Sequence, residues 1–150
     1  MKNRPAQEFV LKLVSTPDSE AKAAAGAALD EHNLEKTGFA DRIPIGARIS
    51  DPDSGTVIGG LWGRTELGLL FLDMFFVRKE ARGNALGARL LAAVEAEAIR
   101  RGCKKAVVET SSFQAPGFYK RHGYEEFGRV EFAVGDHTRI FLRKQLGQQG

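Results

Sequence analysis

Three residues in the middle of the chain have the types and spacing of an anion-binding loop. Arg82 and Gly83 follow the apolar run Leu69–Val77, and Gly87 stands at the beginning of an amphipathic helical pattern. The first turn of a helix presents backbone N–H groups without partners at the positive end of the helix dipole. Glycine at this place lets a phosphate approach the backbone closely. The segment therefore predicts a buried strand, a tight loop and an anion site at the start of a helix.

This loop does not match two common phosphate-binding motifs. A dinucleotide-binding fold would show Gly-x-Gly-x-x-Gly, and a P-loop would end in Gly-Lys-Ser or Gly-Lys-Thr. Neither pattern occurs in the loop. From these residues alone, one alternative stays open: Gly83 and Gly87 could serve only a tight turn and close helix packing.

Asp73 is a candidate general base, because it is the one charged residue within Leu69–Val77. A carboxylate in an apolar strand is costly to bury unless it has a partner. Burial would raise its pKa and suit it to accept a proton from an ammonium group. The alternative is that Asp73 faces solvent or anchors a loop. Glu109, in the apolar segment Lys105–Thr110, is a second candidate of the same kind.

The elements that must position these residues follow from apolar periodicity and turn chemistry. The expected strands are Phe9–Val14, Pro44–Ser50, Thr56–Trp62, Leu69–Val77, Lys105–Thr110, Glu125–Val134 and Thr138–Leu146. The expected helices are Glu20–His32 with a second short turn at Leu34–Gly38, then Ala88–Arg101 and Ala115–His122. Turns are expected at 51–55, 64–68 and 135–137.

A strand–helix–strand unit follows from this order, running from Leu69–Val77 through the long helix to Lys105–Thr110. Such a unit predicts a right-handed crossover and parallel pairing of its two strands. The preceding strands are expected to form an antiparallel meander. The fold class is therefore α/β (α+β), with a mixed, mostly antiparallel sheet flanked by helices, in one domain over residues 1–150.

Composition and charge limit the function classes only weakly. The net charge of +3 suits an anionic cofactor as well as nucleic acid, but no basic recognition helix or aromatic RNA-binding motif is present. Cys103 is the only cysteine, which excludes an internal disulfide and gives no metal-ligand cluster. No apolar run approaches membrane-spanning length. We therefore expect a cytoplasmic protein without metal, nucleic-acid or membrane partners.

Two stretches carry a resemblance to a known family. Val77–Leu90, VRKEARGNALGARL, resembles the acetyl-CoA signature of the GNAT superfamily of N-acetyltransferases, in which Arg or Gln, two residues, Gly, one residue and then Gly or Ala follow a buried strand. Arg82, Leu86 and Gly87 fall in register with it. Ala85 stands where the family usually has its first signature glycine, which is a departure.

The second stretch is Ser111–Tyr124, SSFQAPGFYKRHGY. It resembles a later segment of the same family, in which Asn-x-x-Ala precedes a Phe/Leu-Tyr pair and then Gly-Phe/Tyr. Ser112 replaces the usual Asn, and the matching residues are Ala115, Phe118, Tyr119, Gly123 and Tyr124. The two motifs stand in the family's order, separated by the expected helix and strand.

The resemblance implies a reaction and a set of roles. It implies two splayed parallel central strands, and transfer of acetyl from acetyl-CoA to a primary amine by direct attack in a ternary complex. Tyr119 is implied as the general acid for the departing thiolate, its alternative being an aromatic that fills the core; Asp73 is the base candidate. The implied cofactor-binding residues are Met74, Phe75, Phe76, Val77, Arg82, Gly83, Asn84, Ala85, Leu86, Gly87, Ala88 and Ser112, and the cations available for the remaining phosphate and adenine are Arg78, Lys79, Lys120 and Arg121.

Two function classes stay open at this point. The first is an N-acetyltransferase whose partners are a coenzyme A thioester and a small amine or protein amine, with a homodimer allowed for. The second is a non-catalytic acyl-CoA-binding or regulatory domain, which the departures at Ala85 and Ser112 would permit. Saturable binding of acetyl-CoA without thiol release on any amine would favour the second class.

Overall fold

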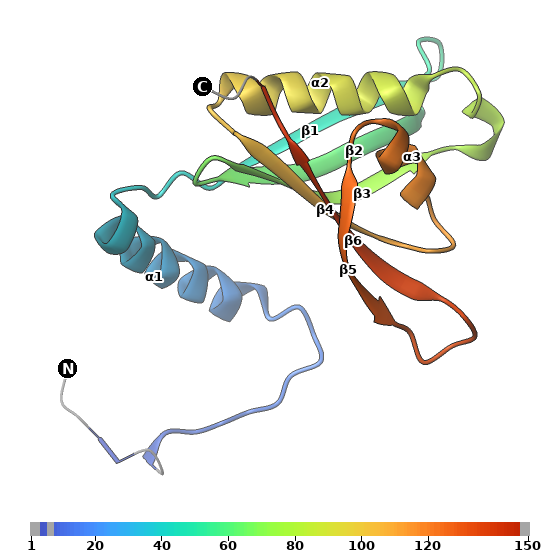
Figure 1. The fold of residues 1–150 in the computed structure, drawn as a ribbon. Coiled ribbons are helices and arrows are strands. Elements are labelled where there is room, and N and C mark those ends of the chain that lie inside the picture. The colour runs from blue at the N-terminus through green and yellow to red at the C-terminus, as the bar shows by residue number, and fades with distance from the viewer. Residues whose placement is uncertain (1–3, 6–7, 148–150) are drawn as a thin grey trace. The chain divides into compact units, whose positions relative to one another are not determined.

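The computed structural model of the chain describes residues 4–5 and 8–147, and it divides into two compact units, Met1–Ala40 and Asp41–Gly150 (Figure 1). The first unit contains α1 (Ser19–Thr37). The described part of the second contains β1 (Ile43–Ser50), β2 (Val57–Glu66), β3 (Leu69–Val77), the short 3₁₀ helix η2 (Lys79–Ala81), α2 (Leu86–Arg100), β4 (Lys105–Ser111), α3 (Pro116–Arg121), β5 (Glu125–Glu131) and β6 (Thr138–Gln145). No helix among the described residues is long and apolar enough to cross a membrane.

One continuous helix, α1, replaces the predicted helix and separate short turn. Asn33 is only a weak helix former and does not break the pattern, and the Thr37 hydroxyl donates to its carbonyl oxygen (2.7 Å). The helix ends at Gly38, whose φ of 82° is left-handed and whose N–H donates to the carbonyl oxygen of Leu34. This is the usual glycine stop for a helix.

The predicted strand Phe9–Val14 is wrong. These residues form no strand, and the side chains of Val10 and Leu13 are 94% and 93% exposed. A strand exists through hydrogen bonds to a neighbouring strand, and the described part of the first unit contains no other strand. An apolar, β-branched stretch is thus not sufficient to make one.

The sheet of the second unit has six strands in the order β1-β2-β3-β4-β6-β5. All neighbours pair antiparallel except β3 and β4, which pair parallel and are joined through α2. The predicted meander is confirmed without the strand Phe9–Val14, and so are the parallel pairing of the crossover strands and the closing hairpin. Figure 1 shows α2 lying across one face of this sheet.

The core lies between α2 and that face. The helix has its apolar residues at helical spacing, and it contacts β1, β2 and β3. Its buried residues are Leu90, Leu91, Val94 and Ala98, and those of the facing sheet include Leu61, Leu70, Leu72, Ala106, Val108 and Leu142. This packing fixes the start of α2 near the end of β3.

Several strand and helix ends differ from the prediction by one or two residues, and two strand ends differ by more. The second strand continues to Glu66, since the chain turns only at Leu67–Gly68, where both residues have positive φ. The fifth strand ends at Glu131 because the N–H of Phe132 donates to the carbonyl oxygen of His137 and closes the loop to β6. The predicted turn at 64–68 and strand end at Val134 are corrected accordingly.

A β-bulge interrupts the pairing of β2 with β3. Trp62 is the partner of Met74 and Gly63 is the partner of Leu72, so Asp73 is the extra residue of β3. A Cβ added at Gly63 would overlap the backbone oxygen of Phe71, which explains glycine at this close approach. A bulge bends its strand, and this one lies where β3 separates from β4.

Candidate active site

The opening between β3 and β4 is the central feature of the site. The two strands pair in parallel only as far as Leu72 with Val108, whereas β3 continues to Val77 and β4 to Ser111. Beyond the last pair there is no ladder between them, and a cavity of about 960 Å³ lies there. The expectation of two splayed parallel strands is confirmed.

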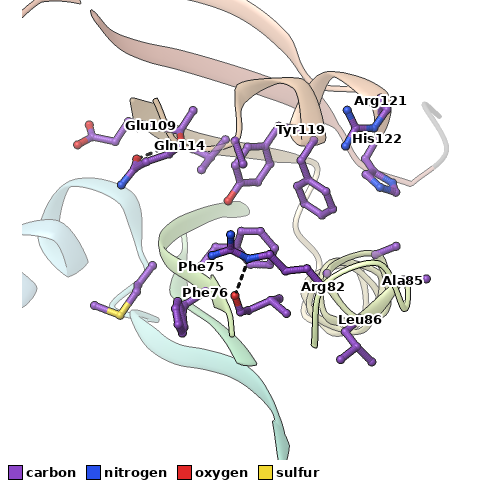
Figure 2. A pocket seen from close by; sticks show the side chains of 18 of the residues that line it. Phe75, Phe76, Arg82, Ala85, Leu86, Glu109, Gln114, Tyr119, Arg121 and His122 are labelled. Atoms are coloured by element: carbon purple, nitrogen blue, oxygen red, sulfur yellow. Dashed lines mark hydrogen bonds between the residues drawn. The ribbon is translucent and has the colours of Figure 1, made fainter. Parts of the chain in front are cut away.

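All predicted site residues except Asn84 and Ser112 line this cavity. They are residues 73–77 of β3, Arg82, Gly83, residues 85–88 at the start of α2, and Tyr119 of α3. In Figure 2, Arg121 and His122 lie at one end of the cavity, Glu109 and Gln114 at the other, and Tyr119 between them. The cavity therefore has a basic end and an end that carries the carboxylate of Glu109, the carboxylate end.

The two predicted residues outside the lining make local hydrogen bonds instead. The side-chain amide of Asn84 donates to the carbonyl oxygen of Ala81 (3.0 Å) and holds the loop before α2. The hydroxyl oxygen of Ser112 accepts from the N–H of Thr138 (3.0 Å), which ties the loop after β4 to β6. Their roles in cofactor binding stay predictions.

The sequence left two readings of Asp73 open, burial in the strand or exposure to solvent, and the structure supports exposure. The Asp73 side chain is 55% exposed, and Oδ1 accepts from Nη1 of Arg64 on β2 (3.3 Å). The bulge accounts for this placement, because the extra residue falls out of the strand's alternation. Asp73 still lines the cavity, so its role as base stays a prediction. The argument that burial raises its pKa no longer supports that role.

The free edge of β3 presents backbone amides to the cavity. The N–H of Arg78 donates to the carbonyl oxygen of Ile58 on β2 (2.8 Å). Successive peptide groups of a strand face opposite edges, so the amides of Val77 and Phe75 face the other edge, toward the opening. The Val77 carbonyl agrees with this assignment, since it accepts from Nε of Arg82 (3.0 Å).

Tyr119 is buried within a group of aromatic rings. Its ring makes edge contacts with Phe75, Phe118 and Tyr124, at centroid distances of 6.1, 5.3 and 5.5 Å. Burial raises the pKa of Tyr119 to about 12, so the phenol is protonated at neutral pH. Its hydroxyl points into the cavity (Figure 2). The ring therefore fills the core, as the alternative reading expected, and the residue also lines the cavity. Its role as general acid stays a prediction.

The start of α2 has the features of an anion site. No side chain among the described residues caps it, so the N–H groups of its first turn are free for a ligand. A Cβ added at Gly87 would come within 2.9 Å of the Phe75 ring and 3.2 Å of the Phe118 ring. Glycine here lets the helix begin close to β3 and α3. Ala85, the N-cap residue, has a left-handed φ of 56°.

Of the four other cations predicted for the cofactor, only one lines the cavity. Arg121 lines the cavity, as does its neighbour His122, whose ring lies 4.7 Å from that of Phe118. Arg78 instead pairs with Glu80 (2.7 Å), and Lys120 with Glu126 (3.5 Å). Neither of these two, nor Lys79, belongs to the lining.

A polar group at the carboxylate end was largely missed by the sequence analysis. Arg139 of β6 donates from Nη2 to Oε1 of Glu109 (2.9 Å) and from Nη1 to the hydroxyl of Ser111 (3.0 Å). It also donates to the side-chain oxygen of Gln114 (3.4 Å). These residues come together only through the β4–β6 register, in which Ser111 is the partner of Arg139. No local sequence pattern predicts that pairing.

Comparison with known proteins agrees with this geometry. The acetyltransferase (GNAT) family matches residues 15–124. The acetyltransferase Atu2258 of Agrobacterium fabrum is 36% identical over 138 residues, which cover 92% of this chain and 98% of that protein. The chain belongs to the GNAT family of acetyltransferases. It is accordingly an acyltransferase enzyme, and the alternative of an acyl-CoA-binding domain without turnover falls away.

Two further similarities support the family assignment. The blasticidin-S acetyltransferase of Streptomyces morookaense is 47% identical over 99 residues, covering 63% of this chain and 70% of that protein. A solved acetyltransferase-like structure from Agrobacterium tumefaciens has a TM-score of 0.80 and 32% identity, covering 92% of this chain and 98% of that one. The acetyl donor of the family is acetyl-CoA, and structures of the same fold hold coenzyme A or acetyl-CoA.

Proposed function

We propose that the protein transfers the acetyl group of acetyl-CoA to a primary amine by direct attack in a ternary complex. The observation that carries the proposal is the meeting of three features in one cavity. These are the free amides of β3, the Tyr119 hydroxyl and the uncapped first turn of α2. Cys103 lies in the core outside the lining, in keeping with a reaction that forms no acyl-enzyme.

The basic end of the cavity fits coenzyme A. The first-turn amides of α2 would hold the pyrophosphate, and Gly87 leaves room for the close packing that places them there. Arg82 uses Nε to bind the Val77 carbonyl, which leaves its two Nη groups for a phosphate. Arg121 and His122 are available to the rest of the cofactor.

The edge of β3 would polarise the thioester. The amides of Phe75 and Val77 are fixed donors that face the opening, and fixed dipoles stabilise negative charge that develops on a carbonyl oxygen. Phe75 and Phe76 take part through their backbone position. Their side chains serve mainly as the walls of the cavity.

Tyr119 would serve as the general acid. The amine nitrogen forms a bond to the carbonyl carbon, the carbon–sulfur bond breaks, and the thiolate receives a proton. The Tyr119 hydroxyl is protonated at neutral pH because burial raises its pKa to about 12, and it faces the cavity. It can therefore donate to the sulfur.

A carboxylate at the opening would receive the proton of the ammonium group. Asp73 is the base that we propose, and Glu109 is the alternative, since both line the cavity and each has one oxygen outside its arginine pair. The pH–rate profile decides between them. Asp73→Asn should remove the acidic limb if Asp73 is the base, and Glu109→Gln should remove it if Glu109 is.

Blasticidin S is the first acceptor to test, because a relative named for its acetylation is 47% identical over 99 residues. Thiol release from acetyl-CoA should be followed with blasticidin S and a panel of primary amines.

Tyr119→Phe should lower kcat by about 100-fold without loss of acetyl-CoA binding. Tyr124→Phe is the matched control, because the Tyr124 hydroxyl donates a hydrogen bond to Glu95 (2.7 Å). This variant should leave kcat unchanged. Equal kcat for Tyr119→Phe and wild type would make the general-acid assignment wrong.

A further inference from the structure

Gln114 is a cavity residue that neither the family motifs nor the proposed chemistry uses. It lies in the loop between β4 and α3, lines the cavity at its carboxylate end, and has an exposed side chain. Figure 2 shows it on the same side of the cavity as Glu109. What it could do depends on which way its amide group points.

Hydrogen bonds fix the orientation of that amide. Its Oε1 accepts from the N–H of Ser111 (2.9 Å), the hydroxyl of Thr110 (3.2 Å) and Nη1 of Arg139 (3.4 Å). A backbone N–H and a guanidinium can only donate, so the atom that they share must be the oxygen. The nitrogen Nε2, with its two N–H donors, therefore points away from this network. No described residue accepts a hydrogen bond from it.

The loop that carries Gln114 is itself held in place. The N–H of Ser112 donates to the carbonyl oxygen of Thr138 (2.8 Å), and the N–H of Thr138 donates back to the Ser112 hydroxyl (3.0 Å). A donor that is already ordered loses little conformational entropy when a ligand binds it. Nε2 is thus a preorganised neutral donor on the cavity wall.

Glu109, which lies beside Gln114 in the cavity lining, is an anionic hydrogen-bond acceptor. Glu109 binds the same guanidinium, through Oε1 and Nη2 of Arg139 (2.9 Å), and no described residue occupies its second carboxylate oxygen. Arg139 therefore places an anionic acceptor and a neutral donor next to one another. An ammonium group suits the first, and an oxygen atom that accepts a hydrogen bond suits the second.

We infer that Gln114 determines acceptor specificity: Nε2 donates to a hydroxyl or carbonyl oxygen close to the amine that is acetylated. The substrate class is then amino alcohols and amino amides in preference to plain alkylamines. This inference rests on the proposed function, because it assumes that an amine occupies this end of the cavity. It adds to that function a requirement on the atoms beside the amine.

Matched acceptors test the inference, namely ethanolamine against propylamine and glycinamide against isobutylamine. The variant Gln114→Glu keeps Oε1 and its tether to Ser111 and Thr110 but replaces the donor nitrogen with an acceptor oxygen. The intrinsic reactivity of each amine is the same for every variant, so it cancels when ratios of kcat/KM are compared. Relative to wild type, Gln114→Glu should lower the preference for the oxygen-bearing acceptor by about fivefold or more. The change should appear in the KM of the acceptor, with the KM of acetyl-CoA unchanged.

Gln145→Glu provides the control for added charge, since Gln145 is exposed on β6 outside the cavity lining. It should leave the ratio unchanged. If amines are acetylated but Gln114→Glu keeps the wild-type ratio, or shifts it no more than Gln145→Glu does, the role of Gln114 is wrong and the acetyltransferase proposal stands. If no amine is acetylated by the wild-type enzyme, the proposed function and this inference fail together.

Discussion

Ala85 holds a backbone conformation that usually belongs to glycine. Its φ of 56° lies in the left-handed region, which costs a residue with a Cβ about 1–2 kcal/mol. The sequence identified Ala85 as a departure from the signature, but it could not show that the consequence lies in the backbone. At the neighbouring Gly83, φ is 90° and a side chain would be strained in the same way.

Ala85→Gly should therefore stabilise the protein. Removing the Cβ relieves the left-handed strain, and the greater flexibility of glycine in the unfolded chain offsets part of the gain. We expect the free energy of unfolding to rise by about 0.5–1 kcal/mol, measured by urea denaturation. Gly83→Ala, the reverse change at a similar φ, should lower it. An unchanged or lower stability for Ala85→Gly would contradict the assignment of strain.

The buried phenol of Tyr119 makes a prediction about alkaline stability. Its pKa is about 10 in the unfolded chain and about 12 when folded, so above pH 10 the folded state keeps a proton that the unfolded state loses. Stability then falls as pH rises from 10 through 12. Tyr119→Phe should show a smaller fall in the free energy of unfolding over this range than wild type. Parallel curves for the two proteins would show that Tyr119 is not buried as described.

At the scale of elements, the site depends on strand ends that the sequence predicts unequally well. The limits of β3 are those predicted, because a run of apolar residues is bounded by turns on both sides. The bulge at Asp73 was not predictable, since it exists only in the pairing of β2 with β3. For the same reason the sequence could not decide whether Asp73 is buried or exposed. The local sequence pattern predicts that β3 is a strand, but its pairing with β2 determines which way each side chain faces.

One carboxylate, that of Glu95, connects α2 with β6 and with the turn before β5. Glu95 of α2 accepts from the Tyr124 hydroxyl (2.7 Å) and from Nζ of Lys144 on β6 (2.8 Å), and its side chain is only 13% exposed. Burial, and then the charge and hydrogen bond of Glu95, raise the pKa of Tyr124. The ring of Tyr124 in turn packs against Tyr119 at 5.5 Å.

Tyr124→Phe should cost about 1–2 kcal/mol in the free energy of unfolding, because it removes a hydrogen bond to a charged, nearly buried carboxylate. Chemical denaturation measures this directly. Tyr119→Phe is the comparison and should cost less, because the Tyr119 hydroxyl makes no hydrogen bond to a described residue. A larger loss of stability in Tyr119→Phe would reverse the roles assigned to the two tyrosines.

At the scale of the whole molecule, the cavity is assembled from segments far apart in the chain. The basic end, where we propose that the cofactor binds, was predictable because its residues are close in sequence and carry family motifs, as in the loop from Arg82 to Gly87. At the other end, proposed for the acceptor, the sequence singled out only Glu109, because Glu109 and Gln114 meet Arg139 only through the β4–β6 pairing. The least predictable part of the cavity is thus the end that we propose selects the acceptor.

The binding of acetyl-CoA should stabilise the protein as a whole. A ligand that binds only the folded state stabilises it by about 2.7 kcal/mol at 100 times its Kd. Acetyl-CoA should therefore raise Tm by several degrees in a thermal melt. Arg82→Gln should reduce that rise while leaving the melt without ligand almost unchanged, since Arg82 is exposed. An equal rise in the variant would remove Arg82 from the cofactor site.

In the proposed reaction an amine accepts the acetyl group directly from acetyl-CoA. The most direct measurement quantifies free coenzyme A thiol and acetylated amine in the same reaction of wild-type enzyme with acetyl-CoA, blasticidin S and the amine panel. Thiol and acetylated amine should form in equal amounts, and the protein itself should gain no acetyl group. Release of thiol without an acetylated amine, or an acetylated protein that passes its acetyl group to the amine, would contradict the proposed reaction.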